Sequence, residues 1–350
     1  MMRSVIRHRA VARAMSGVLV VTGLVWLALL GCRNKQHGQL PTSVPIAIAC
    51  PRNISSSLVI IAKEQGLFYQ DGAVVTLIPF ESGKVSLERM LAGEADLALV
   101  AETPLAKAIL TGGKLSILAS IHQSSRDVAI VARKDRGIHT PSDLEGKVIG
   151  FTQGTSGHFF LDTFCLVNRI GLGSTTFVDL PPLQLRNALL DGKVDAVSTW
   201  DPHVAFLMDA LGPRSVLLRD EFIYTQTFCL VARPEFIRDH PDQVKAILTG
   251  LLSALKFMSG SSTQARDLVA AYTQVEPSLV SKAFTGHDFD VRLDQSLMLS
   301  IENECRWFLD SGAVQNHEIP DVLSYFYLPG LLEVRPEAVQ VIRDEQGGLP

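Results

Sequence analysis

Five consecutive residues have the types and spacing of an anion-binding turn: Gly154, Thr155, Ser156, Gly157 and His158. They follow an apolar run and precede a segment with helical apolar spacing. A glycine-rich turn that opens a helix presents free backbone N–H groups and the positive end of the helix dipole. The two hydroxyls add donors, although Ser and Thr are also common helix N-caps. We therefore expect either an anion contact or a simple cap here, with the anion contact favoured.

Other polar residues follow apolar runs in the same way. In open α/β sheets, ligands bind beyond the carboxyl ends of the strands, and that rule selects Arg52, Asn53, Ser55, Ser82, Gly83, Glu102, Thr103, Trp200 and Asp201. Trp200 could form an aromatic wall or simply pack, and Asp201 could accept from an amine. Arg52 and Arg126 could pair with an anionic group, but each arginine alone is more typical of an exposed surface.

Several catalytic and cofactor chemistries are disfavoured. The segment GTSGH departs from the nucleophile elbow GxSxG at its fifth position, His158, so a hydrolase is a weak alternative. The chain has no GxxxxGK[ST] motif, and GLGSTT follows a helical segment rather than a strand. The nine histidines show no zinc-ligand spacing. We expect a protein without catalytic residues, metal or cofactor.

The N-terminal segment has the pattern of an export signal. Four arginines precede residue 14, an apolar run covers Val18–Leu30, and Leu29–Leu30–Gly31–Cys32 resembles a bacterial lipobox. We expect residues 1–31 to be removed, Cys32 to be lipidated and residues 32–43 to form a tether. An uncleaved anchor helix is the alternative, and both readings place the body outside the cytoplasmic membrane.

The amino-acid composition limits the classes of protein to which this chain can belong. The 350 residues are 47% hydrophobic and 19% charged, with a net charge of −4. This composition suits packed cores, excludes a disordered chain and lacks the basic excess of nucleic-acid binders. The single long apolar stretch excludes a polytopic membrane protein. Four cysteines lie in apolar surroundings, where they act as small buried hydrophobes: Cys50, Cys165, Cys229 and Cys305.

From Val44 to Arg233, short β-rich runs alternate with helical segments, and after Arg233 the pattern turns helical. This alternation predicts an α/β fold with doubly wound sheets. Two segments, LERMLAGEADLALV and LRNALLDGKVDAVS, echo each other, with Gly93 matching Gly192 and Asp96 matching Asp195. We expect these glycines to end helices in the left-handed conformation and these aspartates to be structural. The echo indicates two α/β lobes of similar plan.

Five segments in order resemble the nitrate/sulfonate/taurine-type solute-binding proteins of ABC importers: IIAKEQGLFYQDGAVVTLIPFESG, LERMLAGEADLALV, DLEGKVIGFTQGTSGH, ALLDGKVDAVSTWDP and YLPGLLEVRPEAVQVI. The resemblance spans residues 44–342. It implies the type II periplasmic binding-protein fold, in which two doubly wound lobes are joined by two crossover strands. We expect lobe one at 44–124 and 232–345, and lobe two at 125–231.

The resemblance also implies a ligand in the cleft between the lobes, hinge closure and a monomer that docks on a membrane permease. Tyr224, Thr225 and Thr227 would lie on the return crossover, where some side chains face the ligand. The anion-friendly turn favours a sulfonate-like solute, with taurine and nitrate as relatives of that class. A thiamine-pyrimidine-precursor or other aromatic solute receptor, or a synthase of the same fold, is the alternative. Transport and sensing both remain open.

Overall fold

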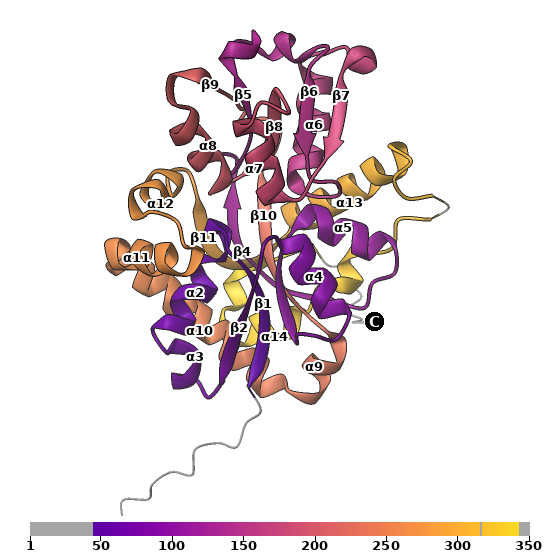
Figure 1. The fold of residues 1–350 in the computed structure, drawn as a ribbon. Helices are drawn as coiled ribbons and strands as arrows, with labels where there is room; N and C mark the ends of the chain where they lie inside the picture. The colour runs from indigo at the N-terminus through magenta and orange to yellow at the C-terminus, as the bar shows by residue number, and fades with distance from the viewer. Residues whose placement is uncertain (1–44, 316, 343–350) are drawn as a thin grey trace, which may run out of the picture. The chain divides into compact units, whose positions relative to one another are not determined.

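The computed structural model describes residues 45–315 and 317–342. Their strands form a seven-stranded sheet of order β12-β11-β4-β10-β3-β1-β2 and a five-stranded sheet of order β7-β6-β8-β5-β9 (Figure 1). Each sheet is flanked by helices, which makes the fold α/β as expected. Cys32 and the rest of the export signal lie outside the described residues.

The seven-stranded sheet contains β1 Ile46–Pro51, β2 Val75–Phe80, β3 Leu97–Ala101, β4 Ser116–Ser124, β10 Gln226–Ala232, β11 Asp288–Asp294 and β12 Val339–Gln340. Strand β1 pairs in parallel with β2 and β3, whereas β10 pairs antiparallel with both β3 and β4. Antiparallel neighbours arise here because β4 leads out of this sheet and β10 returns to it. The parallel part therefore places the carboxyl ends of β1, β2 and β3 at one edge.

The five-stranded sheet contains β5 Val128–Arg133, β6 Val148–Phe151, β7 Thr176–Asp179, β8 Ala196–Trp200 and β9 Ser215–Leu218. Strand β6 pairs in parallel with β7 and β8, and β5 pairs antiparallel with β8 and β9. The chain thus leaves the first sheet between β4 and β5 and re-enters it between β9 and β10. The return falls at Gln226, six residues before the expected start of the second part of lobe one.

The helices cover both sheets. The α-helices are α2 Ser57–Glu64, α3 Leu67–Gln70, α4 Gly83–Leu91, α5 Glu102–Leu110, α6 Ser156–Val167, α7 Pro182–Leu190, α8 His203–Leu211, α9 Pro234–Asp239, α10 Pro241–Gly260, α11 Ser262–Thr273, α12 Pro277–Ala283, α13 Gln295–Asp310 and α14 Leu328–Val334. The 3-10 helices are η1 Ile54–Ser56, η2 Lys134–Arg136, η3 Pro141–Leu144, η4 Leu172–Ser174, η5 Gly212–Arg214, η6 Val322–Tyr325 and η7 Pro336–Ala338. Over the described ranges, none of these helices is both long and apolar enough to cross a bilayer.

The β-rich runs expected between Val44 and Arg233 form strands β1 to β10, but the purely helical reading beyond Arg233 is wrong at β11 and at the two-residue strand β12. Strand β11, with the sequence DFDVRLD, pairs antiparallel with β4 and extends the first sheet. Its four charged residues hide the apolar signal, because only Val291 and Leu293 are fully buried in it. Ion pairs from Arg292 to Asp288, Asp290 and Asp294 compensate for the charge.

The two echoing segments have the same local structure. Gly93 and Gly192 both adopt positive φ, at 82° and 71°, directly after α4 and α7. The Asp96 carboxylate accepts from the Ala47 backbone N–H, and the Asp195 carboxylate accepts from that of Val148, each at 2.9 Å. Each aspartate thereby ties the start of one strand to the neighbouring strand. The structural reading of these residues is confirmed.

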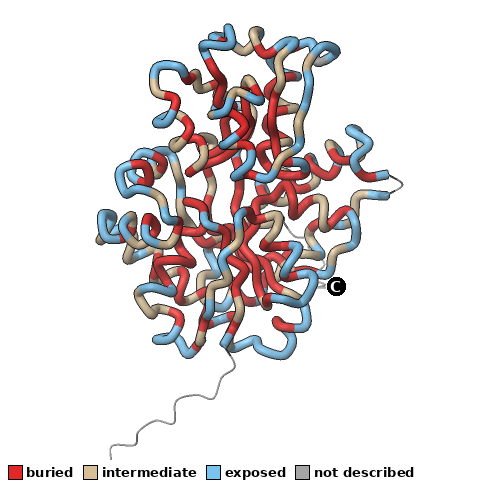
Figure 2. Tube along the Cα trace, viewed as in Figure 1, coloured by how far each residue is buried: buried red, intermediate tan, exposed pale blue. Residues whose placement is uncertain are grey.

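Buried residues lie along the central strands of both sheets, and exposed residues gather on outer helices and loops (Figure 2). The first sheet packs around one large core cluster, and the second sheet has a cluster on each face. Cys50, Cys165, Cys229 and Cys305 are buried free thiols, as expected of small apolar side chains.

Candidate functional site

Three helices begin at one small cavity between the two sheets. Its lining includes residues from the first turns of α4, α5 and α6, together with strand ends from both sheets. The full set is Asn53, Ser82, Gly83, Lys84, Ala101, Pro104, Thr155, Ser156, Trp200, Gln226 and Phe228. We call this space the cleft cavity. It lies at the carboxyl ends of parallel strands, where the general rule for α/β sheets places a ligand.

Helix geometry gives the cleft cavity a positive character. The first N–H groups of an α-helix have no acceptor within the helix, and the dipole adds about half a positive charge at that end. Helices α4, α5 and α6 have nine, nine and twelve residues, so each carries a developed dipole. The Ser82 side chain caps α4 by accepting from the Val85 N–H. The convergence of three such ends favours an anion.

Lys84 supplies the one charged side chain in the cavity lining. It lies in the first turn of α4, and its Nζ donates to the Gln153 carbonyl oxygen at 3.0 Å. Gln153 is the second residue after β6 of the other sheet, so this bond links the two sides of the cavity. An anion in the cavity would therefore meet a full positive charge as well as helix dipoles.

Gln226 is the central polar side chain of the site. Its Oε1 accepts from the Ser156 hydroxyl at 2.8 Å, and its Nε2 donates to the Asp127 carboxylate at 2.7 Å and to the Ser55 hydroxyl at 3.4 Å. All four residues are buried. The Ser156 hydroxyl is thus held by Gln226 at the start of α6, and this bond joins the second sheet's helix to a strand of the first sheet.

The cleft cavity is small. Its volume of about 20 Å³ has room for about one water molecule. Trp200, at the end of β8, and Phe228, on β10, form its aromatic walls and are 6% and 2% exposed. A solute larger than water would therefore need the two sides to move apart, which is the hinge motion that the family resemblance predicts.

Some predicted residues lie away from the cavity. Arg52 is exposed, with Nη1 donating to the Gln274 side chain at 3.4 Å, and Thr225 is also exposed. Arg126 pairs with Glu221 at 3.0 Å. None of these three side chains lines the cleft cavity, and Arg126 lines a different pocket, which also contains Asp201.

Glu102 and Tyr224 form a buried cross-link beside the cavity rather than part of its lining. The Tyr224 hydroxyl donates to one carboxylate oxygen of Glu102 at 2.6 Å, and the Thr227 N–H donates to the other at 2.8 Å. Burial raises the pKa of Glu102 to about 7, with these hydrogen bonds opposing the rise. The three residues fasten α5 to the return crossing, which is a structural role. Thr103, the next residue of α5, is buried as well.

The predicted turn divides into residues that face the cavity and residues that support it. Thr155 and Ser156 line the cavity, and Gly154 adopts φ +70°. Gly157 instead faces β8, where a Cβ atom would lie 3.1 Å from the Ser198 carbonyl oxygen. The His158 ring is largely buried, accepting from the Gly154 N–H at 3.3 Å and packing on Phe151. Gly157 and His158 therefore hold the turn in shape.

Asp201 belongs to a different polar region. Burial raises the pKa of its carboxyl to about 7, and the Ala205 N–H donates to Oδ1 at 3.0 Å. One ligand atom each from Asp127, Asp201 and His287 lie within 4.8 Å of one another. Sequence reasoning placed Asp201 beside a cleft ligand, but Asp201 does not line the cleft cavity.

Five lining residues escaped the sequence analysis: Lys84, Ala101, Pro104, Gln226 and Phe228. Ala101 and Pro104 flank the predicted pair Glu102 and Thr103. Lys84 follows the predicted pair Ser82 and Gly83, so extending each strand-end loop into the first helical turn would have found it. Gln226 and Phe228 lie on an antiparallel strand with no loop signal. Their position depends on the pairing of β10 with β3 and β4.

The family described as NMT1/THI5 like matches residues 53–265 of the chain. A Bacillus subtilis (strain 168) protein, named provisionally as an aliphatic sulfonates-binding protein, is 26% identical over 271 residues, 75% of this chain and 80% of that protein. The taurine-binding periplasmic protein of Escherichia coli (strain K12) is 25% identical over 190 residues, 53% of this chain and 58% of that protein.

Solved structures share the fold. The alkanesulfonate-binding protein SsuA from Xanthomonas axonopodis pv. citri, bound to MOPS, superposes with a TM-score of 0.70 at 19% identity, covering 81% of this chain and 98% of that one. The periplasmic aliphatic sulphonate binding protein SsuA from Escherichia coli gives 0.68 at 17% identity, covering 81% and 97%. These similarities confirm the two-lobed binding-protein fold and the family resemblance.

Proposed function

The chain belongs to the NMT1/THI5-like family, and we propose that it is an extracytoplasmic receptor that captures a small anionic solute for an ABC importer. The observation that carries this proposal is the convergence of α4, α5 and α6 on the cleft cavity, with Lys84 beside them. The relatives named for sulfonate and taurine binding favour a sulfonate-type head group.

The solute would bind in three steps that the geometry suggests. The two sides open, the anionic group enters between the helix N-termini, and the Thr155–Ser156 turn closes on it from the second sheet. Backbone N–H groups and the Ser82 hydroxyl would donate to its oxygens, and the Ser156 hydroxyl would turn from Gln226 Oε1 to the solute. Trp200 and Phe228 would pack on its apolar part. Because these groups bind without a nucleophile and base in contact with each other, the solute should leave chemically unchanged.

Calorimetric titration of the purified protein with ethanesulfonate, taurine and nitrate tests the proposal. Ser156→Ala should weaken ethanesulfonate binding roughly ten- to a hundredfold, because a hydrogen bond to a charged group contributes about 1.5–3 kcal/mol. Ser262→Ala is the matched control, since Ser262 is also the first residue of a twelve-residue helix but is exposed. It should bind like wild type.

Two results would contradict the proposal. Equal binding by folded Ser156→Ala and wild type would make the turn a helix cap only. Tighter binding of an aminopyrimidine than of any anion in the panel would favour the alternative of an aromatic solute, with Trp200 and Phe228 as the recognition surface. Recovery of the bound sulfonate by mass spectrometry, with no new product, would agree with a receptor that does no chemistry.

We further propose that Cys32 carries the membrane anchor. The apolar run ending at Leu29–Leu30–Gly31–Cys32 supports lipidation, and a triacylated cysteine supplies the several chains that stable anchoring needs. Mass spectrometry of the membrane fraction should find a mature N-terminus at acylated Cys32. An intact N-terminal segment in that fraction would instead indicate an anchor helix.

A further inference from the structure

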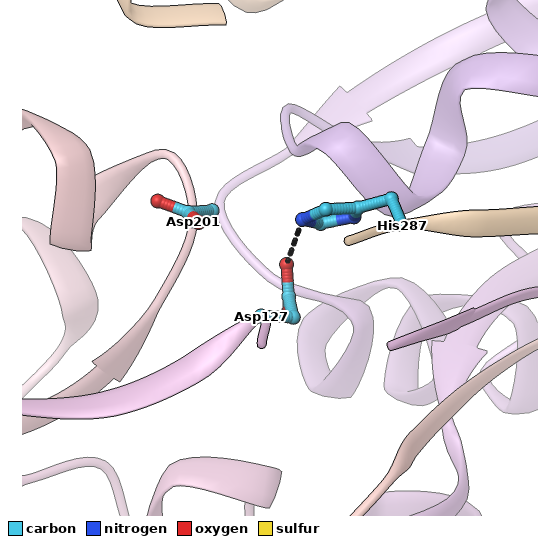
Figure 3. A group of neighbouring side chains, drawn as sticks. All are labelled: Asp127, Asp201 and His287. Atoms are coloured by element: carbon cyan, nitrogen blue, oxygen red, sulfur yellow. Dashed lines mark ion pairs between the residues drawn. The ribbon is translucent and has the colours of Figure 1, made fainter. Parts of the chain in front are cut away.

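Gln226 also contacts a second polar group of buried side chains, which consists of Asp127, Asp201 and His287 (Figure 3). His122 lies behind it, with Nε2 2.7 Å from Nδ1 of His287. We call these four residues the acid–histidine cluster. Asp127 precedes β5 and Asp201 follows β8, on the five-stranded sheet, whereas His287 precedes β11 and His122 lies on β4, in the seven-stranded sheet. The cluster therefore draws on both sheets.

Two atoms at its centre lack partners. His287 Nε2 and Asp127 Oδ1 face each other at 3.8 Å, and neither makes a hydrogen bond to any described residue (Figure 3). Both side chains are buried, at 0% and 1% exposed. A buried polar atom without a partner is costly, which points to a missing group between them.

The surrounding bonds already orient both ligands. His287 Nδ1 lies 2.7 Å from His122 Nε2, which leaves Nε2 as the free nitrogen of the His287 ring. The second carboxylate oxygen of Asp127 accepts from Gln226 at 2.7 Å. Metal-binding histidines typically have their other ring nitrogen held in this way, and ligating carboxylates are likewise hydrogen-bonded.

The local charge also favours a cation. Arg126, which is close by, is neutralised by its ion pair with Glu221. Arg219 is the other nearby guanidinium, and within the described residues it makes no ion pair to either aspartate. In the described part of the chain, the two buried carboxylates of Asp127 and Asp201 thus have only the Arg219 guanidinium nearby as an uncompensated positive charge. Arg126, Asp201 and Arg219 line a pocket of about 330 Å³, which offers a route from solvent.

We propose that Asp127, Asp201 and His287 bind a zinc-type divalent cation that fastens the two sheets to each other. Zinc lies about 2.0–2.1 Å from histidine nitrogen and about 2.0–2.2 Å from carboxylate oxygen, so it fits between atoms 3.8 Å apart. One nitrogen and two carboxylates with an open fourth position suit zinc. Calcium would need six to eight oxygens, and magnesium an octahedral oxygen shell.

Such a cation would also affect the cleft cavity. Asp127 holds Gln226, and Gln226 holds the Ser156 hydroxyl, so the zinc ligand is two hydrogen bonds away from the predicted anion turn. By fixing Asp127 and His287 together, the cation would favour the closed arrangement of the cleft. This coupling rests on the proposed function, but zinc binding itself does not.

The test is a calorimetric titration of chelator-treated, dialysed protein with Zn²⁺, and separately with Mg²⁺, without any solute. We expect one equivalent of zinc per chain and no comparable binding of magnesium. Asp127→Asn and His287→Gln should each weaken zinc binding at least tenfold, with circular dichroism verifying the fold. Asp162→Asn is the matched control, because His158 Nε2 and Asp162 are also 3.8 Å apart but are more exposed and have no third ligand.

Several outcomes would overturn the proposal. The proposal is wrong if the folded wild-type protein does not bind zinc, and this result requires no variant. Zinc binding that persists in both cluster variants, or that is lost in Asp162→Asn, would place the metal elsewhere. If Asp127→Asn or His287→Gln does not fold, zinc titrations of the other variant and of Asp201→Asn test the proposal instead. Since no solute is present, failure here leaves the sulfonate titrations unaffected, and the reverse holds as well.

Discussion

The cleft cavity and the acid–histidine cluster meet at one residue, Gln226, and obtain their polar atoms in different ways. In the cleft cavity, backbone N–H groups at three helix starts are supplemented by hydroxyls and Lys84. In the cluster, carboxylates and imidazoles come from segments around residues 122, 127, 201 and 287. The first region suits an anion and the second a cation.

This contrast shows how one fold holds opposite charges close together. The N-termini of α4, α5 and α6 line the cleft cavity. The cluster residues instead lie next to or on strands β4, β5, β8 and β11. Gln226 can serve both regions because an amide has an acceptor and a donor group. Its Oε1 faces the hydroxyl and its Nε2 faces the carboxylate.

The largest effect is expected from Gln226→Met, which removes the shared residue. Buried Asp127 and Ser156 would each lose a partner, and such losses cost roughly 1–3 kcal/mol apiece, more for charged groups. We expect the free energy of unfolding to fall by about 3–4 kcal/mol in urea titrations. Ethanesulfonate binding should weaken in the same variant.

Gln123→Met on the neighbouring strand is the control for this change. Gln123 is partly buried, donates to the Thr227 hydroxyl at 3.2 Å and accepts from the Arg292 guanidinium. It contacts neither Ser156 nor Asp127 through a hydrogen bond, so its stability loss should be smaller. Equal losses in the two variants would mean that Gln226 does not join the regions.

The next effect concerns pH and Glu102, which lies beside the cleft cavity but outside it. Burial raises the pKa of this carboxyl from 4.5 to about 7. Folding therefore favours the neutral carboxyl, and its contribution to stability is full below pH 4.5 and is lost as pH rises through about 7. Relative to Glu102→Gln, wild type should lose on the order of 3 kcal/mol of stability across that window.

Melting temperatures of both proteins from pH 4 to pH 8 measure this difference. Subtracting the melting temperatures of Glu102→Gln from those of wild type cancels the contribution of the buried histidines. Their pKa values are lowered, so they make stability rise with pH. Glu88→Gln, at an exposed position of α4, should leave the pH dependence of wild type unchanged. A Glu102→Gln profile parallel to wild type would show that Glu102 is ionised in the fold.

Gly157→Ala tests whether Gly157 supports the predicted anion turn by packing against β8. The added Cβ would lie 3.1 Å from the Ser198 carbonyl oxygen, against a strand that cannot easily move. Overpacking of this kind costs about 1–3 kcal/mol, so stability should fall in chemical denaturation. Gly260→Ala, with nothing within 4 Å of its new Cβ, should not be destabilised by contact. A stable Gly157→Ala would contradict the tight packing of α6 on β8.

The smallest effect is expected from Lys84→Met. Lys84 is partly exposed, and ion pairs of that kind contribute about 0.2–1 kcal/mol. Ethanesulfonate affinity should fall by roughly twofold to fivefold, and its salt dependence should weaken because one positive charge is gone. Calorimetry at low and high salt measures both. An unchanged salt dependence would mean that the helix ends alone hold the anion.

The sequence by itself determined most of the strands and helices and the place of the predicted anion turn. Strand runs, helix spacing and terminating glycines are local signals, and they located β1 to β10, the left-handed Gly93 and Gly192, and the start of α6 at Ser156. The cleft residues Asn53, Ser82, Thr155 and Trp200 followed from the same logic. A strand end and a helix start are adjacent in the chain, so their residues can be read together.

Only the tertiary structure decided which of these polar residues face a cavity and which brace it. Glu102 carries the same strand-end signal as Ser82 but bonds to Tyr224, and Gly157 turns toward β8 while Ser156 turns toward Gln226. The acid–histidine cluster has no sequence signal, because Asp127, Asp201 and His287 are 74 and 86 residues apart along the chain. Strand β11, masked by its own charges, brings His287 to β4, and sheet pairing rather than local spacing makes that contact.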